Sequence, residues 1–203
     1  MKTKDFVLVI LPALLWPISF ILLHSIFIYA LLGSVIVLAT VSLLFYKQII
    51  SWGKLKNTAL LIAIGIIGAA ALYAIFYFGN FAASAIGIGG LVDNIYNMIY
   101  GNVAKVQLVV LLAFIGLFEE IYWRGALQSY VKRNSRVFKN IPWVATTIYY
   151  TVVHISALNP ILVVAAFLVG LITSIIADRY GIISSIITHI VWIELIVVLI
   201  PVL

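Results

Sequence analysis

Six ionisable side chains stand inside stretches of the chain that are otherwise apolar enough to lie in a membrane. They are three carboxylates, one guanidinium and two imidazoles: Glu119, Glu120, Arg124, His154, His189 and Glu194. A charged side chain at the centre of a bilayer costs on the order of 3 kcal/mol, even on the most lenient insertion scale. We therefore expect these groups to face a bundle interior or a wet cavity, where they mark a functional site.

Three of these residues form a cluster on one predicted helix. Glu120 and Arg124 are four positions apart, so they share one helix face and can form an ion pair. Glu119 is rotated by about 100° from Glu120 and points elsewhere. A carboxylate outside the ion pair suits a general base that activates water. The simpler interpretation is an ion-pair cluster that only orients helices.

His154 and His189 lie on two further predicted helices, and each alone could be a packed histidine. Two histidines and a carboxylate on separate helices can, however, converge in a bundle core. Such a set supplies the base, the water site and the donor that acyl hydrolysis needs. The same three side chains could instead bind a divalent metal such as zinc. The lack of an HExxH motif favours a route without metal or other cofactor.

The composition indicates which structure must position these residues. Hydrophobic residues make up 66% of the 203 residues, and charged residues only 9%. A soluble domain carries about 25% charged residues, so lipid is the expected solvent. The net charge of +6 does not indicate nucleic-acid binding, because no basic run is interleaved with aromatic residues. The absence of cysteine excludes disulfides, thiolate metal sites and cysteine nucleophiles. Ser184 and Ser185 are better interpreted as small polar packing residues than as nucleophiles.

Apolar runs of about 20 residues predict about seven membrane spans. The expected spans cover residues 6–23, 25–46, 58–78, 106–131, 142–157, 161–177 and 182–200. With a cytoplasmic N-terminus, every basic residue between spans except Lys105 falls on the cytoplasmic side, as the positive-inside rule demands. The prediction is an all-α, polytopic transmembrane helical bundle. Residues 79–105, rich in Gly and Asn, are expected to form an external loop with a short interfacial or re-entrant helix.

Three segments carry a family resemblance. The first is Glu119-Glu120-Ile121-Tyr122-Trp123-Arg124, an EExxxR motif, and the second is Tyr150-Thr151-Val152-Val153-His154, an aromatic-xxx-His motif. The third is His189. Together they resemble the CPBP family, which contains the CAAX prenyl endopeptidases of the Rce type and bacteriocin-processing and self-immunity membrane proteins. The resemblance implies a catalytic core at residues 106–200 of one transmembrane domain, 1–203, with N-terminal spans and the external loop at 1–105.

By this resemblance the protein is an intramembrane endopeptidase of a prokaryotic cell membrane. Its substrate would be a membrane-associated protein or peptide, such as a prenylated CAAX-type protein, cut near its terminus. Glu119 would take a proton from water, His154 would hold that water or share the proton, and His189 would donate to the oxyanion. Glu120 and Arg124 would position the helix, or Arg124 would meet the substrate's C-terminal carboxylate.

One position departs from the family pattern. Ile193 follows His189 by four residues, where the family commonly has Asn or another polar group. Losing one donor of an oxyanion hole costs roughly 10²–10³ in rate. Either another donor serves, or the protein is a slow enzyme or is non-catalytic. A non-catalytic protein would be a membrane scaffold or a bacteriocin-immunity factor. Intramembrane Glu and His also occur in proton-coupled transporters, but the chain lacks the internal repeat typical of that class.

Overall fold

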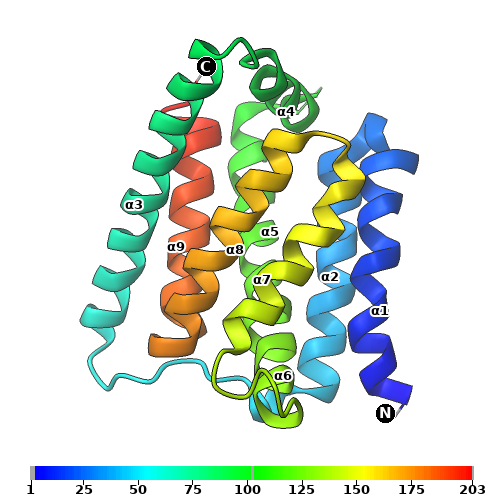
Figure 1. Cartoon of the computed structure of the whole chain (residues 1–203), viewed down its shortest axis with the longest axis vertical. Coiled ribbons are helices and arrows are strands. Elements are labelled where there is room, and N and C mark those ends of the chain that lie inside the picture. Colours follow the sequence, from blue (N-terminus) through cyan, green and yellow to red (C-terminus); the bar gives the residue numbers. More distant parts are fainter. Residues whose placement is uncertain (1–2, 102, 203) are drawn as a thin grey trace.

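The computed structural model describes residues 3–101 and 103–202. These residues are mostly helical and contain no strand, so the predicted all-α bundle is confirmed. The first helices are α1 (Thr3–Pro17), α2 (Phe27–Phe45), α3 (Thr58–Ala85) and α4 (Gly90–Tyr100). They are followed by α5 (Lys105–Glu120), α6 (Gln128–Asn134), α7 (Pro142–Val153), α8 (Pro160–Tyr180) and α9 (Ile182–Glu194). Figure 1 shows the long helices side by side, with α4 across one end.

Short turns of wider or tighter helix extend or join these helices. They are η1 (Ile18–Leu22), η2 (His24–Ile26), η3 (Lys47–Ile49), η4 (Ile121–Leu127), η5 (His154–Ala157) and η6 (Leu195–Leu199). Among the described residues, six continuous segments are long and apolar enough to cross a membrane. The fifth predicted span, 142–157, is not among these six segments and forms the shorter α7 and η5. The seven-span topology therefore stays a prediction.

Local signals set the ends of α8. The side chain of Asn159 accepts hydrogen bonds from the backbone N–H groups of Ile161 and Leu162, which caps the first turn. At the other end Gly181 adopts a φ of 94°, and a Cβ there would lie 2.7 Å from the Cα of Gly53. Only glycine fits this conformation and this close approach. The turn lets α9 run back beside α8.

Small residues bring α3 and α9 into close contact. A Cβ at Gly65 would lie 2.6 Å from the Cβ of Ile187, and one at Gly68 would lie 2.6 Å from Oγ1 of Thr188. The Thr188 hydroxyl also donates to the carbonyl oxygen of Gly65 over 3.0 Å. This packing of small residues fixes the rotation of α9. His189, the next residue, is consequently held in the bundle interior, where it is buried.

The predicted external loop contains α4, which covers the end of the bundle opposite the N-terminus (Figure 1). Val92 and Tyr96 of this helix are buried. The hydroxyl of Tyr96 donates to the carbonyl oxygen of Ile196 over 2.7 Å, and that of Tyr100 donates to the carbonyl oxygen of Val197 over 2.8 Å. These bonds use carbonyl groups of η6 and tie α4 to the end of α9.

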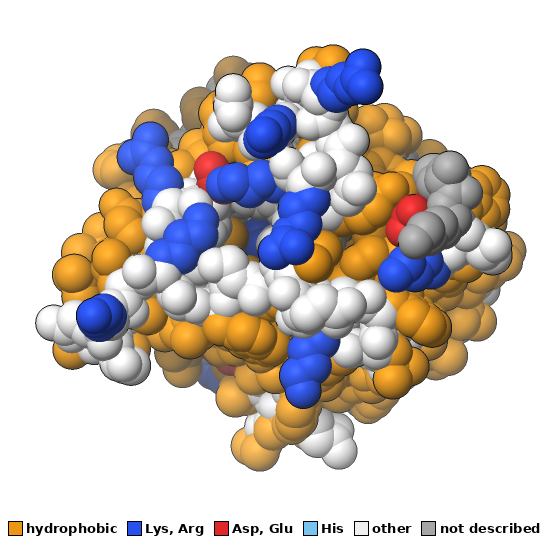
Figure 2. All heavy atoms as spheres, turned by 90° about the horizontal axis from the view of Figure 1, so that it is seen from below, with side chains coloured by type: hydrophobic (Ala, Val, Ile, Leu, Met, Phe, Trp, Pro, Cys, Tyr) orange, Lys and Arg blue, Asp and Glu red, His pale blue; other side chains and the backbone are white. Residues whose placement is uncertain are grey.

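Basic side chains gather at the opposite end, which Figure 2 shows from below. They belong to the start of α1, the α2–α3 and α6–α7 connections, and the last turns of α6 and α8: Lys4, Lys47, Lys54, Lys56, Lys132, Arg133, Arg136, Lys139 and Arg179. Lys105 lies in the first turn of α5 at the other end. This asymmetry is what the positive-inside rule expects, and a cytoplasmic N-terminus remains our prediction.

Candidate active site

The cluster Glu119, Glu120 and Arg124 lies where α5 passes into η4, a turn of π-helix. All three side chains are buried, with exposed fractions of 3%, 0% and 2%. A π-helical turn inside an α-helix is rare and is frequently found at functional sites. The sequence placed these residues in a span, and the structure places them in the core of the bundle.

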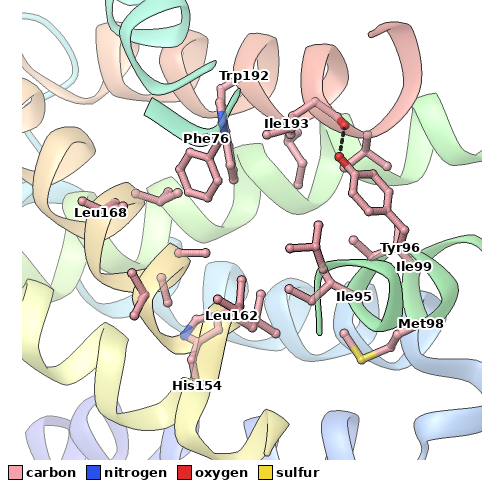
Figure 3. A pocket seen from close by; sticks show the side chains of 18 of the residues that line it. Phe76, Ile95, Tyr96, Met98, Ile99, His154, Leu162, Leu168, Trp192 and Ile193 are labelled. Atoms are coloured by element: carbon pink, nitrogen blue, oxygen red, sulfur yellow. Dashed lines mark hydrogen bonds between the residues drawn. The ribbon is translucent and has the colours of Figure 1, made fainter. Parts of the chain in front are cut away.

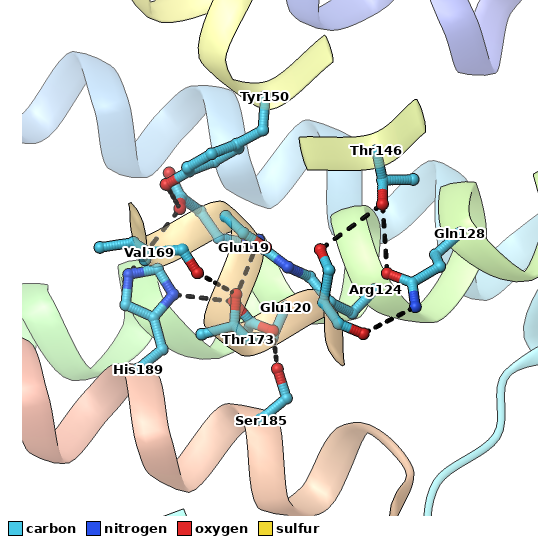
Figure 4. A network of polar contacts seen from close by, with 12 residues as sticks. Glu119, Glu120, Arg124, Gln128, Thr146, Tyr150, Val169, Thr173, Ser185 and His189 are labelled. Atoms are coloured by element: carbon cyan, nitrogen blue, oxygen red, sulfur yellow. Dashed lines mark hydrogen bonds and ion pairs between the residues drawn. The ribbon is translucent and has the colours of Figure 1, made fainter. Parts of the chain in front are cut away.

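Glu120 is the centre of a polar network (Figure 4). Its Oε1 atom lies 3.1 Å from Nη1 of Arg124, which forms the ion pair expected from their spacing. The same oxygen lies 2.9 Å from Nδ1 of His189. The hydroxyl of Ser185 donates to the other oxygen. Ser185, which the sequence indicated as a small polar packing residue and not a nucleophile, thus also satisfies a buried carboxylate.

Glu119 points away from this ion pair, as its position on the helix predicts. Its Oε2 atom accepts a hydrogen bond of 2.7 Å from the hydroxyl of Tyr150 on α7. The same oxygen lies 4.0 Å from Nε2 of His189 on α9. His189 thus lies between the two glutamates, with one ring nitrogen toward each. Figure 4 shows Tyr150 and His189 on either side of Glu119.

His154 belongs to the same region but bonds to other groups. Its Nδ1 atom lies 2.6 Å from the carbonyl oxygen of Tyr150, and its Nε2 atom lies 3.2 Å from Nε1 of Trp16. Because an indole N–H can only donate, Nε2 must accept, and Nδ1 carries the hydrogen. Both ring nitrogens therefore have partners. No hydrogen bond or ion pair joins His154 to Glu119 within the part of the chain that the structure describes.

A cavity of about 260 Å³ opens beside these side chains. Glu119, Tyr150, His154 and His189 line it, whereas most of its wall is apolar and comes from α2, α3, α4, α8 and α9. Figure 3 shows residues of α4, including Ile95, facing the cavity. The three predicted catalytic residues therefore share one cavity, which α4 covers.

Ile193 and Trp192 both line this cavity (Figure 3). Ile193 offers no donor, as the sequence showed. The indole N–H of Trp192 is buried and has no hydrogen-bond partner among the described residues. The Trp192 ring lies 5.9 Å from the ring of His189, measured between centroids. An unsatisfied buried N–H is uncommon and costly, so this group is the second potential donor in the cavity. Sequence reasoning missed it.

Part of the chain, including most of the site, matches a known protein family. Residues 101–193 match the family model described as Type II CAAX prenyl endopeptidase Rce1-like. This segment belongs to the Rce1-like family. No curated protein and no solved structure gives a significant match to the chain. The matched residues cover α5 to most of α9, and so include both glutamates, Arg124 and both histidines of the site.

The six long apolar helices and the match of residues 101–193 to the Rce1-like family together make the chain an integral multi-pass membrane protein. The family that residues 101–193 match is one of CAAX-type intramembrane proteases, which act on membrane-associated proteins or peptides. Trp16 and the α4 cover lie outside the matched segment. These parts of the site are therefore not described by the family match.

The site residues do not form a metal-ligand set in the described parts of the chain. A zinc site of the His₂Glu type would need one free ring nitrogen from each of His154 and His189, plus Glu119. Both nitrogens of His154 are bonded, to Trp16 and to the Tyr150 carbonyl oxygen. His154 would have to break one of these two bonds before it could bind a metal.

Proposed function

We propose that this chain is an intramembrane endopeptidase in which Glu119 activates the water that hydrolyses a peptide bond. One observation carries the proposal: Glu119 lines the cavity, whereas Glu120 is bonded to Arg124, Ser185 and His189. A general base must reach the reacting water, and it must not be neutralised by a permanent counter-ion. Glu119 meets both conditions better than Glu120.

The proposed reaction is the hydrolysis of a peptide bond by one water molecule. Glu119 takes one proton from water, and the hydroxide adds to the carbonyl carbon of the peptide bond. The carbonyl π-electrons move to oxygen and form an oxyanion. When the oxyanion collapses, the C–N bond breaks and Glu119 returns the proton to the leaving amine. The products are one carboxylate terminus and one amine terminus, and no oxidant or other co-reactant is needed.

The oxyanion needs donors in the cavity, and we assign this role to His189 and Trp192. Nε2 of His189 faces Glu119 across 4.0 Å, so a reacting carbonyl group beside that carboxylate comes within its reach. Because Nδ1 of His189 already donates to the Glu120 carboxylate, Nε2 can donate only when both ring nitrogens carry a hydrogen, so our proposal takes His189 as the imidazolium. Trp192 follows His189 by three residues on the same helix face, and its N–H is unpartnered among the described residues. The indole would take the place of the polar group that Ile193 lacks.

His154 has a narrower role in this proposal than the sequence suggested. It would hold the water on Nε2 only after the hydrogen bond from Trp16 opens. Its Nδ1–H bond to the Tyr150 carbonyl oxygen also braces the residue whose hydroxyl holds Glu119. We therefore propose His154 as a residue that positions Tyr150 and that binds water once Trp16 has released it.

The apolar wall of the cavity supports a substrate with an apolar part next to the cleaved bond. A prenylated CAAX-type protein and an apolar peptide leader both have this property. Cleavage near a terminus follows from the family resemblance.

The test compares termini of membrane proteins in cells that express the native chain, Glu119→Gln or Glu194→Gln. Glu194 is a matched control because it is a second glutamate within a span that does not line the cavity. We expect one or more trimmed termini to disappear with Glu119→Gln and to persist with Glu194→Gln. Unchanged trimming with Glu119→Gln would contradict the proposal.

Ile193 favours a second candidate function, that of a non-enzymatic scaffold or immunity factor. It places an aliphatic side chain, which has no hydrogen-bond donor, in the cavity that also contains His189. The same cells distinguish the two. If Glu119→Gln preserves the cellular phenotype of the native chain, hydrolysis is not the function. A metal-free reaction is part of our proposal as well, and stoichiometric metal in active protein together with loss of activity on chelation would overturn that part.

A further inference from the structure

The cavity that contains Glu119 occupies one half of the bundle. Glu119 itself lies midway along the 30-residue segment Lys105–Asn134. The lining residues of α3 begin at Ile75, those of α8 end at Val169, and those of α9 begin at His189. Each of these stretches belongs to the half of its helix that is nearer to α4 (Figure 1). The cavity therefore extends from Glu119 toward the α4 end of the bundle and away from the basic end.

A layer of buried polar contacts separates this cavity from the basic end (Figure 4). The ion pair of Glu120 and Arg124, 3.1 Å long, belongs to this layer. One turn nearer to the basic end, Nε2 of Gln128 donates to the carbonyl oxygen of Ser174 over 2.9 Å, and its Oε1 atom accepts from the hydroxyl of Thr146 over 3.2 Å. All five residues are buried. A peptide that came from the basic end would have to separate a buried ion pair, which is costly.

The cavity reaches the surface of the bundle between α3 and α8. In the halves nearer to the basic end these helices are in contact, since a Cβ added at Gly68 would lie 2.7 Å from Cδ1 of Ile176. Nearer to α4, Ile75 of α3 and Val164 of α8 both line the cavity, and their exposed fractions are 39% and 56%. Gly79, one turn beyond Ile75, also lines the cavity and is exposed. The cavity therefore has an opening at the side of the bundle, toward the lipid.

The helix α4 closes the end of the bundle above this opening. The hydroxyls of Tyr96 and Tyr100 bond to carbonyl oxygens of η6, and Nδ2 of Asn159 donates to the carbonyl oxygen of Leu91 over 2.8 Å. Figure 3 shows Ile95 and Tyr96 of this helix beside the cavity. Three side chains thus hold α4 in place, and the way in lies beneath it, at the side. Both α3 and α4 lie outside the matched residues 101–193.

We propose that the peptide reaches Glu119 from the half of the membrane near α4, through the opening between α3 and α8. This inference rests on the proposed hydrolysis and deepens it, because it defines the substrate class. The opening is apolar and faces lipid, so the substrate is a membrane-anchored segment. The positive-inside rule predicts that the basic end is cytoplasmic, so the cleaved bond lies on the extracytoplasmic side. An apolar peptide leader on that side fits this route, whereas a lipid-anchored terminus in the cytoplasmic leaflet would meet the polar layer.

The chain has no cysteine, so one substitution places a single thiol on either side of the polar layer. Ala166→Cys places it in the cavity, and Ser129→Cys places it in a second cavity, of about 330 Å³, at the basic end. The measurement is the labelling rate of each full-length variant by a membrane-impermeant cationic methanethiosulfonate, in membrane vesicles of either orientation. Hydrolysis requires a wet cavity, and this small reagent follows the water.

We expect the two thiols to be labelled from opposite faces of the membrane. Ala83→Cys, which also lines the cavity but lies nearer to α4, should be labelled from the same face as Ala166→Cys. It provides a second reading if Ala166→Cys does not fold. Labelling of the cavity thiols from the face that labels Ser129→Cys would overturn the proposal. So would a complete lack of labelling of both cavity thiols, because water must reach Glu119.

Gly79→Trp tests the opening itself. A Cβ at Gly79 would meet no atom within 4 Å, so the indole has room and covers the way in. Gly33→Trp is the matched control: Gly33 is exposed, has the same free space and does not line the cavity. Each glycine lies six positions from the α4 end of its helix, α3 or α2. In neutral detergent, Gly79→Trp should slow the labelling of Ala166→Cys by the apolar reagent N-phenylmaleimide, and Gly33→Trp should not. Equal rates in the two variants would overturn this route.

The labelling assays need no hydrolysis, so they can succeed when the terminus comparison shows no trimming. The terminus comparison supplies an independent reading on the substrate. We expect the termini that depend on Glu119 to lie on the extracytoplasmic side. Trimmed termini confined to the cytoplasmic side would overturn this inference and leave the proposed hydrolysis intact.

Discussion

The hydroxyl of Tyr150 donates to Oε2 of Glu119 over 2.7 Å and so joins α7 to α5 at the head of the cavity. The same tyrosine lies under the guanidinium of Arg124, and its carbonyl oxygen accepts from His154. One residue thus contacts three members of the predicted site. Its hydroxyl fixes the direction of the carboxylate that we propose as the base, so Tyr150 is a positioning residue in the reaction.

Tyr150→Phe keeps the ring and removes only the hydroxyl. The loss of one hydrogen bond to a charged group is worth about 1.5–3 kcal/mol, so we expect kcat to fall by roughly 10- to 100-fold with KM little changed. The measurement is steady-state kinetics on a substrate found by the terminus comparison. Tyr149→Phe is the control, since Tyr149 donates to the carbonyl oxygen of Val9 and does not line the cavity. A full kcat for Tyr150→Phe would show that Glu119 needs no such support.

The two adjacent glutamates should differ in what their loss does to stability. Glu120→Gln leaves Arg124 as a buried charge without its counter-ion, which typically costs about 3–5 kcal/mol. Glu119→Gln breaks no ion pair with Arg124 and keeps a side chain that can accept from Tyr150. We therefore expect a much larger fall in the unfolding temperature in detergent for Glu120→Gln, while both variants lose activity. Equal falls would mean that Glu119 is structural as well.

The sequence predicted those parts of the site that depend on spacing within one helix. The four-residue interval between Glu120 and Arg124 placed them on one face, and the structure contains their ion pair. The high cost of charge in lipid also singled out His154 and His189 from their positions in apolar runs. Both histidines line one cavity with Glu119. This could be predicted because polar groups in a membrane bundle turn away from the lipid.

Contacts between distant residues could not be predicted in this way. Trp16 and His154 are separated by 138 positions, and an indole in an apolar run gives no signal that its N–H will meet a histidine. Ser185 looked like a packing residue because a buried serine has the same sequence appearance whether or not it bonds a carboxylate. The helix α4 was expected only as a short element in a loop, since its contacts with η6 depend on the tertiary fold.

Trp16→Phe tests whether Trp16 limits the use of His154. The phenyl ring preserves most of the packing, but Nε2 of His154 loses its donor. We expect the variant to lose about 1–3 kcal/mol of stability, because a buried acceptor is left unpaired, and to show a higher kcat because Nε2 is free to hold water. Thermal unfolding and steady-state kinetics measure the two effects. A lower kcat would contradict the water-holding role and would leave His154 as a residue that only orients Tyr150.

Trp192→Phe removes the proposed second oxyanion donor while the aromatic ring continues to pack against Phe76 and His189. Loss of one such donor costs roughly 10²–10³ in kcat, and KM should change little because the donor acts on charge that develops in the transition state. Trp143→Phe, at the basic end of α7 and outside the cavity, is the matched control. Adding Ile193→Asn to Trp192→Phe supplies a side-chain N–H on the same helix and should restore part of the lost rate. If Trp192→Phe keeps the full kcat and Ile193→Asn alone has no effect, the oxyanion is stabilised by His189 without help from either position.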